Sequence, residues 1–197
     1  MPRMGLTRDK IFETAGKLAD EQGFDSVSPA ALARLFGVRL PSLYAHITSS
    51  DDLKQGVALL GLRLLAETSE EAVAGRSGKD ALIALAGAYR AFAQHHPGLF
   101  QAARYPLGDD SVAASGGARL AKINHAMLRG YDLEEEDRVH ATRLIGAFVL
   151  GFSLLELAGS FDHSAPDIGT SWERGIAGLD TLIRSWAKDE HLHAKAK

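Results

Sequence analysis

Apolar side chains recur at helical spacing along nearly the whole chain, and no segment alternates between apolar and polar residues as a strand would. The first apolar stripe predicts a helix that begins after Thr7, a capping residue, and ends at Gly23. Two shorter helical patterns follow within residues 28–47. The pattern therefore predicts an all-α fold that begins with a compact head of three helices.

The two short patterns meet at Gly37, which lies where a tight turn is needed. Ala33 is small at the point where the two helices would cross, and we expect Val38 and Leu43 to hold the second helix against the first. This arrangement is typical of a helix-turn-helix, whose second helix enters the major groove of DNA. The sequence thus predicts a DNA-binding head over residues 1–48.

A helical body follows the head. Ser49 and Asp52 form a capping box at its start, and Thr170 with Glu173 forms another before its last helix. The other helices are predicted at about residues 50–73, 79–96, 99–105, 118–129 and 134–159. We expect a second domain over 49–190, which carries dimerisation, and a frayed, solvated tail over 191–197.

The last two predicted helices carry more apolar surface than one chain is expected to cover. After Val139, the helix over 134–159 is apolar almost all round, so it needs neighbours on more than one side. We interpret the surplus as the interface of a homodimer, with a monomeric core as the alternative. The predicted interface residues are Leu144, Phe148, Leu155, Trp172, Ile176, Leu179, Ile183 and Trp186.

Composition limits the class of protein. The chain has 197 residues, a net charge of −3 and no cysteine, which fits a reducing cytoplasm and excludes a disulfide framework. The residues before the first helical pattern are too few for a signal peptide. The longest apolar run, 146–155, is much shorter than the roughly 20 residues that span a bilayer. We expect a cytoplasmic protein without a membrane partner.

Local charge favours a double-stranded DNA partner for the head. No Asp or Glu lies between Asp25 and Asp51, and Arg34, Arg39 and His46 fall within that window. An acid-free patch on a mildly acidic protein favours site-selective binding over general phosphate affinity. The predicted DNA-binding residues are Ser28, Arg34, Arg39, Leu40, Pro41, Ser42, Tyr44, His46 and Ser50.

These residues are expected to divide into two roles. Arg39, Leu40 and Ser42 are candidates for base edges, with Leu40 against a thymine methyl group, whereas Tyr44 and His46 are candidates for phosphates. Pro41 shapes the first turn of the second helix. Arg34 fits either a phosphate contact or a solvated face.

The chain resembles the tetracycline-repressor (TetR) family of bacterial transcriptional regulators. The resemblance is specific over about residues 7–60 and weaker beyond. It rests on Ala30, Ala33, Gly37-Val38, Leu43-Tyr44, His46-Ile47, Leu53, Gly151-Phe152, Leu155-Glu156, Ala158-Gly159, Phe161 and Ser171-Trp172-Glu173. It implies a homodimeric regulator, most often a repressor, whose body binds a small-molecule effector and then releases operator DNA.

Two positions depart from the family pattern. Arg39 stands where Ser or Thr is common, which removes a helix cap but offers a bidentate ligand for guanine or phosphate. Ser50 stands where Lys is common, which removes a charge from the phosphate contact. Asp51 and Asp52 follow directly and repel phosphates.

The body offers candidates for an effector pocket, although aromatic residues at helical spacing more often belong to a core. Glu156 is the sharpest of them, because a carboxylate in so apolar a helix must be paired, hydrogen-bonded or facing a cavity. It fits a cationic effector, a pair near Arg143 or a group of the partner chain. The candidates are Phe92, His96, Phe100, Tyr105, Met127, Phe148, Phe152 and Glu156.

No pattern indicates catalysis, a cofactor or a metal. His95-His96 and His191-x-His193 have no carboxylate or cysteine partners at ligand spacing. Neither a nucleophile triad nor a phosphate-binding glycine loop is present in a suitable context. The alternative to a regulator is a helical small-molecule-binding or catalytic protein that carries an unused helix-turn-helix-like head.

Overall fold

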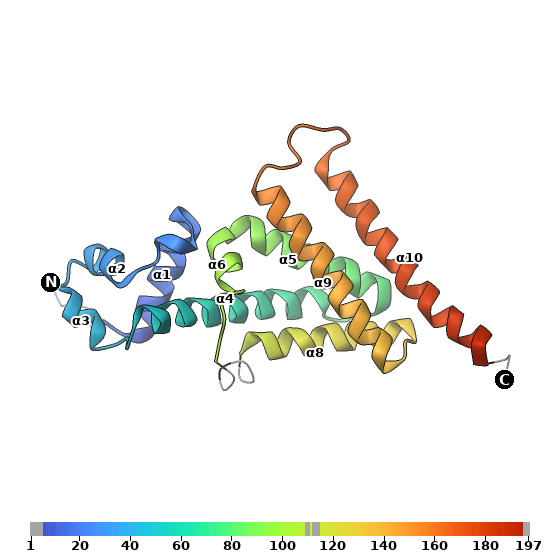
Figure 1. Ribbon diagram of the computed structural model, residues 1–197, viewed down its shortest axis with the longest axis horizontal. Coiled ribbons are helices and arrows are strands. Elements are labelled where there is room, and N and C mark those ends of the chain that lie inside the picture. Colours follow the sequence, from blue (N-terminus) through green and yellow to red (C-terminus); the bar gives the residue numbers. More distant parts are fainter. Residues whose placement is uncertain (1–5, 109–110, 112–114, 195–197) are drawn as a thin grey trace. The chain divides into compact units, whose positions relative to one another are not determined.

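The computed structural model describes residues 6–108, 111 and 115–194, and only the backbone of residues 187–194. Within these residues every regular element is helical, which confirms the all-α prediction (Figure 1). The elements are α1 (Arg8–Gln22), η1 (Phe24–Ser26), α2 (Pro29–Phe36), α3 (Leu40–Tyr44), α4 (Ser50–Val73), α5 (Gly78–His95), α6 (Pro97–Ala102), α8 (Gly116–Leu128), η2 (Arg129–Tyr131), α9 (Glu135–Leu157) and α10 (Ile168–Ala194).

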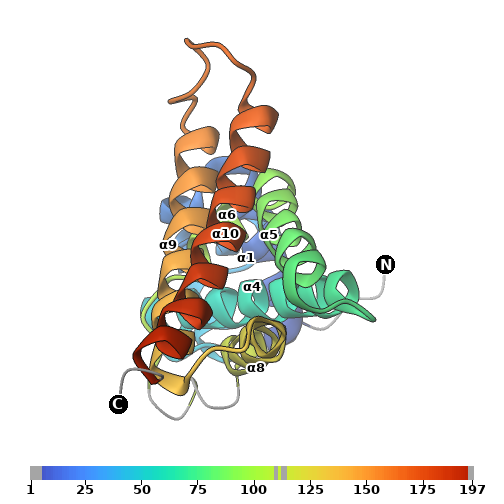
Figure 2. The same ribbon diagram turned by 90° about the vertical axis from the view of Figure 1, so that its right-hand side faces the viewer.

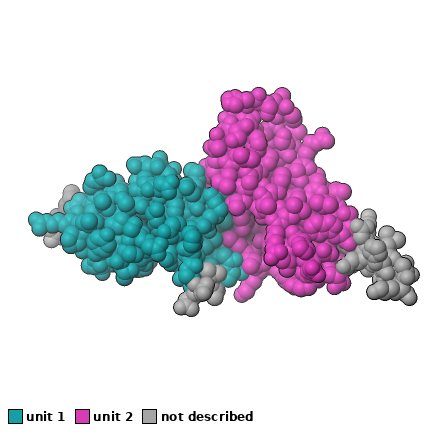
Figure 3. Space-filling model, viewed as in Figure 1, with its two compact units in different colours: residues 1–66, 95–118 teal, residues 67–94, 119–197 magenta. Residues whose placement is uncertain are grey.

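The chain forms two compact units, shown in different colours in Figure 3. Unit 1 comprises residues 1–66 and 95–118, and unit 2 comprises residues 67–94 and 119–197. This division differs from the predicted boundary at 48/49, since most of α4 and all of α6 belong to unit 1. Capping signals locate the start of α4, but they do not reveal which helices pack against it.

In unit 1, α6 packs closely against α1. A Cβ atom on Gly98 would lie only 2.1 Å from the carbonyl carbon and oxygen of Ala19, so glycine is required for this approach. Asp20 of α1 accepts a hydrogen bond from the backbone N–H of Leu99 at 2.9 Å. A second oxygen of Asp20 lies 2.8 Å from Nδ1 of His96. These contacts hold α6 against α1, the first helix of the chain.

In unit 2, α9 and α10 run side by side (Figures 1 and 2). The predicted capping box at Thr170 is wrong, because α10 begins two residues earlier, at Ile168. Asp167 accepts a hydrogen bond from the backbone N–H of Thr170 at 2.9 Å, and hydrogen bonds from Thr170 lower the pKa of Asp167. Helix α10 continues to Ala194, so the predicted tail begins inside a helix, while 195–197 lie outside the described residues.

Helix α9 is the one described helix that is long and apolar enough to cross a membrane by length and composition alone. Its most apolar window has a mean hydropathy of 1.3, and 22% of that window is buried within the chain. A single helix of this kind is weak evidence for a membrane span, because core helices of soluble proteins meet the same test. Its low burial does show that the chain alone leaves much of this apolar helix exposed.

Candidate DNA-binding surface and ligand cavity

The turn between α2 and α3 has the geometry of a helix-turn-helix. Gly37 adopts the left-handed conformation (φ 64°, ψ 31°), which a residue with a Cβ atom adopts only with strain. Its backbone N–H bonds to the carbonyl of Arg34 at 3.2 Å, and that of Val38 bonds to Ala33 at 3.0 Å. Leu43 is fully buried as predicted, but Val38 remains 36% exposed, so it contributes less to the contact between the helices than expected.

Helix α3 presents the predicted base-reading residues to solvent. Arg39, which directly precedes the helix, is exposed and makes no side-chain cap. Leu40 is 39% exposed and Tyr44 is 47% exposed. The opposite face is anchored by Leu43, so the exposed side chains lie on a helix whose orientation is fixed by burial. Pro41, Ser42 and Ser50 are also exposed, and His46 is half-buried.

The start of α2 is capped by the predicted residue. The Ser28 hydroxyl accepts a hydrogen bond from the backbone N–H of Ala31 at 3.2 Å, and Pro29 follows at the first helical position. Ser28 is half-buried, and Arg34 on the same helix is exposed. The Ser28 oxygen therefore already has a structural partner, whereas Arg34 extends from the surface.

An arginine of α1 binds the acidic start of α4. The guanidinium of Arg8 donates to both carboxylate oxygens of Asp52, and its Nη1 donates to the backbone carbonyl of His46 at 2.9 Å. Asp52 also accepts a hydrogen bond from the backbone N–H of Thr48 at 2.7 Å. The Arg8 contact holds the pKa of Asp52 below its ordinary value. The repulsion that the sequence suggested at Asp52 is thus offset by a cation that sequence spacing did not reveal.

A capping box has two reciprocal hydrogen bonds, and the structure confirms one of them at the start of α4. The hydroxyl of Ser49 accepts a hydrogen bond from the backbone N–H of Asp52 at 2.9 Å. The Asp52 carboxylate bonds to the backbone of Thr48 instead of returning to Ser49. Asp51 accepts a hydrogen bond from the hydroxyl of Tyr105 at 2.7 Å. Both acids are therefore engaged within unit 1.

Unit 2 contains a mainly apolar cavity of about 230 Å³ between α5, α8 and α9. Its polar groups are Tyr89, Asn124 and Thr142, and no charged side chain lines it. Burial raises the pKa of the Tyr89 hydroxyl to about 12. The apolar and glycine lining residues are Leu85, Ala86, Ile145, Gly146, Val149 and Leu150.

None of the residues predicted for an effector pocket lines this cavity. His96 bonds to Asp20, and Tyr105 bonds to Asp51 in unit 1, where Phe100 is buried. Phe92 is buried in α5, and Met127 lines a separate groove of unit 2. The aromatic spacing therefore identified residues of the packed cores. The sequence signal that could have located the cavity was a polar residue on an otherwise apolar helix face, at Asn124 and Thr142.

The remaining three candidates form an aromatic and ionic cluster within unit 2. Phe148 and Phe152 pack against Trp172, with ring centroids 5.6 and 5.1 Å away. Glu156 binds the guanidinium of Arg90 through two hydrogen bonds of 2.6 and 2.8 Å. These bonds hold the pKa of Glu156 below its ordinary value. The carboxylate is therefore paired within its own chain, with a partner that was not among the predicted ones.

The predicted dimer residues differ in how far the chain itself buries them. Their own unit already buries Trp172, Ile176, Leu179 and Ile183, while Leu144, Phe148 and Trp186 are half-buried. Leu155 is 48% exposed. Among the described side chains of α9 and α10, the large apolar ones that the chain itself leaves exposed are Val139, Leu154, Leu155, Leu157 and Leu182.

Comparison with known proteins identifies the family. Residues 82–179 match the family model described as the tetracyclin repressor-like C-terminal domain. The chain is 38% identical over 166 residues to the HTH-type transcriptional regulator Rv0681 of Mycobacterium tuberculosis, a match that covers 82% of this chain and 75% of the relative. The chain belongs to the TetR family of transcriptional regulators. The HTH-type transcriptional regulator YobS of Bacillus subtilis is 32% identical, over 82% of this chain and 85% of its own length.

Solved structures share the TetR-family fold. Apo ActR from Streptomyces coelicolor superposes with a TM-score of 0.68 at 20% identity, covering 93% of this chain and 98% of its own. ActR has also been solved in complexes with (S)-DNPA and with actinorhodin. The expectation that this regulator uses no metal stays a prediction, although no three His, Cys, Asp or Glu side chains gather at ligand distance in the described part of the chain.

Proposed function

We propose that this TetR-family regulator is a cytoplasmic, homodimeric repressor that a small molecule releases from palindromic operator DNA. The observation that carries the proposal is the helix-turn-helix, in which buried Leu43 fixes α3 while Arg39, Leu40 and Tyr44 stay exposed on it or directly before it. Two such helices about one turn of DNA apart read successive major grooves.

The exposed residues of the head fit different parts of the duplex. Arg39, Leu40 and Ser42 are assigned to base edges, where arginine recognises guanine and leucine contacts a thymine methyl group. Tyr44, His46 and Arg34 are assigned to phosphates. Exposed Ser50 offers its hydroxyl to a phosphate at the N-terminal end of α4, where the helix dipole favours an anion.

A second copy of the chain is the partner that fits α9 and α10. The helices leave Leu154, Leu155, Leu157 and Leu182 between 37% and 48% exposed. An exposed apolar face of this kind is typical of an association surface. Two copies related by a two-fold axis would bury the same face on each other and would place two recognition helices on one palindrome.

The cavity between α5, α8 and α9 is the proposed effector site. Its lining is apolar except for Tyr89, Asn124 and Thr142, so it suits a small uncharged molecule with one or two hydrogen-bonding groups. An unpaired charge would be costly in such a lining. The ligand complexes of ActR support a ligand-binding body on this fold.

A gel-shift titration tests the regulator assignment. The purified full chain is mixed with the promoter fragment beside its own gene, at low salt and without added ligand. We expect a retarded band that competitor DNA of unrelated sequence does not remove, and an affinity that falls steeply as salt rises, because phosphate contacts release counterions. No shift with any such fragment would overturn the proposal and favour a helical binding protein with an unused head.

A further inference from the structure

Helix α8 and the turn after it carry an unusual distribution of charge. Residues 115–131 contain Arg119, Lys122 and Arg129 but no Asp or Glu, although the chain as a whole has a net charge of −3. The next acid is Asp132. A concentrated positive segment on an acidic protein raises the local concentration of anions.

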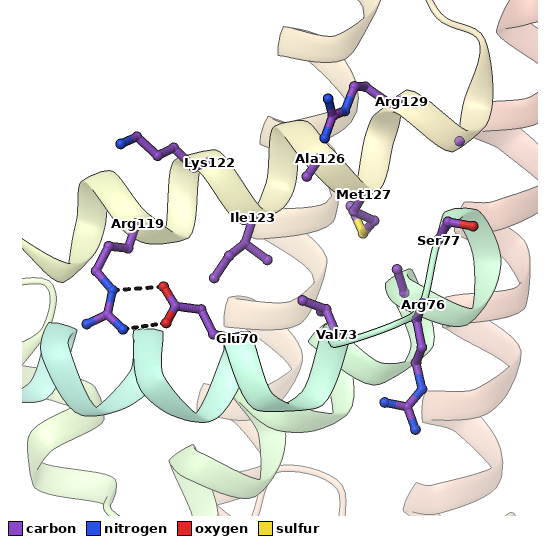
Figure 4. Close-up of a pocket in the computed structure, with 12 residues that line it drawn as sticks. Glu70, Val73, Arg76, Ser77, Arg119, Lys122, Ile123, Ala126, Met127 and Arg129 are labelled. Carbon is purple, nitrogen blue, oxygen red and sulfur yellow. Dashed lines mark hydrogen bonds and ion pairs between the residues drawn. The ribbon is translucent and has the colours of Figure 1, made fainter.

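This basic segment forms one wall of a groove of about 640 Å³ within unit 2 (Figure 4). The other walls come from the last part of α4 and the beginning of α5. Val73, Ile123 and Met127 line the groove, and the latter two are only 8% and 3% exposed. The groove shares no lining residue with the proposed effector cavity.

Helical spacing places a basic stripe beside an apolar one. Lys122, Ala126 and Arg129 are separated by four and three residues, so they follow one edge of α8 into η2. Ile123 and Met127, four residues apart, form the adjacent stripe that faces the groove. An extended molecule in the groove would therefore contact apolar and cationic groups together.

The cations on the rim differ in how they are already engaged. Arg119 binds the carboxylate of Glu70 through two hydrogen bonds, which closes one end of the groove (Figure 4). Arg76 points away from α8 and donates to the carbonyl of Ala72. Lys122 and Arg129 form no ion pair with any described residue. Their charges remain for an outside anion.

We propose that this groove is a second ligand site, which binds an amphiphilic anion such as a chain carboxylate. The apolar body lies over Val73, Ile123 and Met127, and the anionic head group lies between Lys122 and Arg129. Glu70 does not repel it, because that carboxylate is neutralised by Arg119. A short carboxylate such as acetate lacks the apolar body, and a neutral alcohol of the same chain length lacks the charge.

Calorimetric titration of the full-length protein tests this site with three probes: decanoate, 1-decanol and acetate. We expect decanoate to bind about tenfold or more tightly than decanol, since charge-assisted contacts are lost in the alcohol. Acetate should bind least. Equal affinities for decanoate and decanol, or no binding of decanoate below its solubility limit, would overturn the proposal.

Variants locate the binding. Combined Lys122→Ala and Arg129→Ala should weaken decanoate about tenfold or more. Ala126→Phe, at an exposed position that lines the groove, should obstruct binding without removing a charge. Arg143→Ala removes an exposed cation outside the groove and should change nothing. Unchanged affinity in the double variant, with native circular dichroism, would overturn the site. Loss of binding in Gly146→Leu, a position that lines the other cavity and not the groove, would also overturn it.

Discussion

Arg90 and Glu156 form a bidentate ion pair that joins α5 to α9, at 2.6 and 2.8 Å. The side chains are only 19% and 13% exposed, and the Arg90 guanidinium also lies 5.2 Å from the centre of the Trp172 ring. One side chain thus connects α5, α9 and α10. A pair so shielded from water is costly to break on one side only, because the remaining charge keeps its desolvation penalty.

Glu156→Gln is expected to destabilise the protein by about 1–3 kcal/mol, because Arg90 loses its counter-charge. The pKa of Glu156 is lowered in the folded state, so the stabilisation is present above the ordinary carboxyl pKa and is lost as pH falls through the lowered value. Urea unfolding measured from acid to neutral pH should show a weaker pH dependence in the variant. Exposed Glu173→Gln is the control, and an equal effect of both substitutions would contradict the role of the pair.

Arg8→Ala is expected to weaken operator binding, because it leaves the charge of Asp52 uncovered near the phosphate contact at Ser50. Adding Asp52→Asn to this variant should restore much of the affinity, since the repulsion disappears with the carboxylate. Fluorescence anisotropy with labelled operator DNA measures both. If the second substitution gives no recovery, Arg8 acts through another contact, such as its bond to the carbonyl of His46.

Arg39→Ala is expected to weaken specific DNA binding by about 1–3 kcal/mol if the guanidinium recognises a guanine. The measurement compares the operator with variants altered at single base pairs. The substitution should relax the preference at one position and leave the others intact. A loss spread equally over all sequences would assign Arg39 to a phosphate instead.

Gly146→Leu is expected to fill the effector cavity. A Cβ atom at this position meets nothing within 4 Å, and the residue lines the cavity, so the larger side chain can enter it without displacing the backbone. The variant should keep operator binding but no longer respond to ligands that release the parent protein. Gly87→Leu is the matched control, because its Cβ is equally unobstructed and it does not line the cavity. A normal ligand response in Gly146→Leu would place the effector elsewhere.

Leu155→Arg is expected to dissociate the homodimer, because it places a charge on the exposed apolar face of α9, where Leu155 is 48% exposed. Sedimentation velocity should show a monomer with native helix content. Ile83→Arg, at an apolar residue of α5 that is 48% exposed, is the control for adding a charge at a similarly exposed site. An unchanged dimer would exclude this part of α9 from the interface.

The head was predictable because its signals are local. The turn needs a left-handed backbone that Gly37 adopts without strain, Ser28 caps α2, and Leu43 must be buried for α3 to pack. Each of these constraints acts between residues a few positions apart. The structure confirmed the turn and the caps, while it showed that Val38 is more exposed than the pattern indicated.

The cavity and the ion pairs were not predictable in the same way. Aromatic spacing suggested Phe100 and Tyr105 for a pocket, but the former is core and the latter bonds to Asp51. The cavity instead involves Asn124 and Thr142, which are 18 positions apart and come together only when α8 and α9 pack. Periodicity marks which face of a helix is buried, and it leaves the neighbour of that face undetermined.

The sequence by itself determined an all-α chain with a helix-turn-helix, because helix periodicity, caps and the Gly37 turn depend on contacts within a few residues. Only the tertiary structure decided that Arg8 covers Asp52, that Arg90 pairs with Glu156, and which helices line the cavity. Those pairs are separated by 44 and 66 positions. Which residues pair depends on how whole helices pack together, and the spacing of residues along the sequence does not determine that packing.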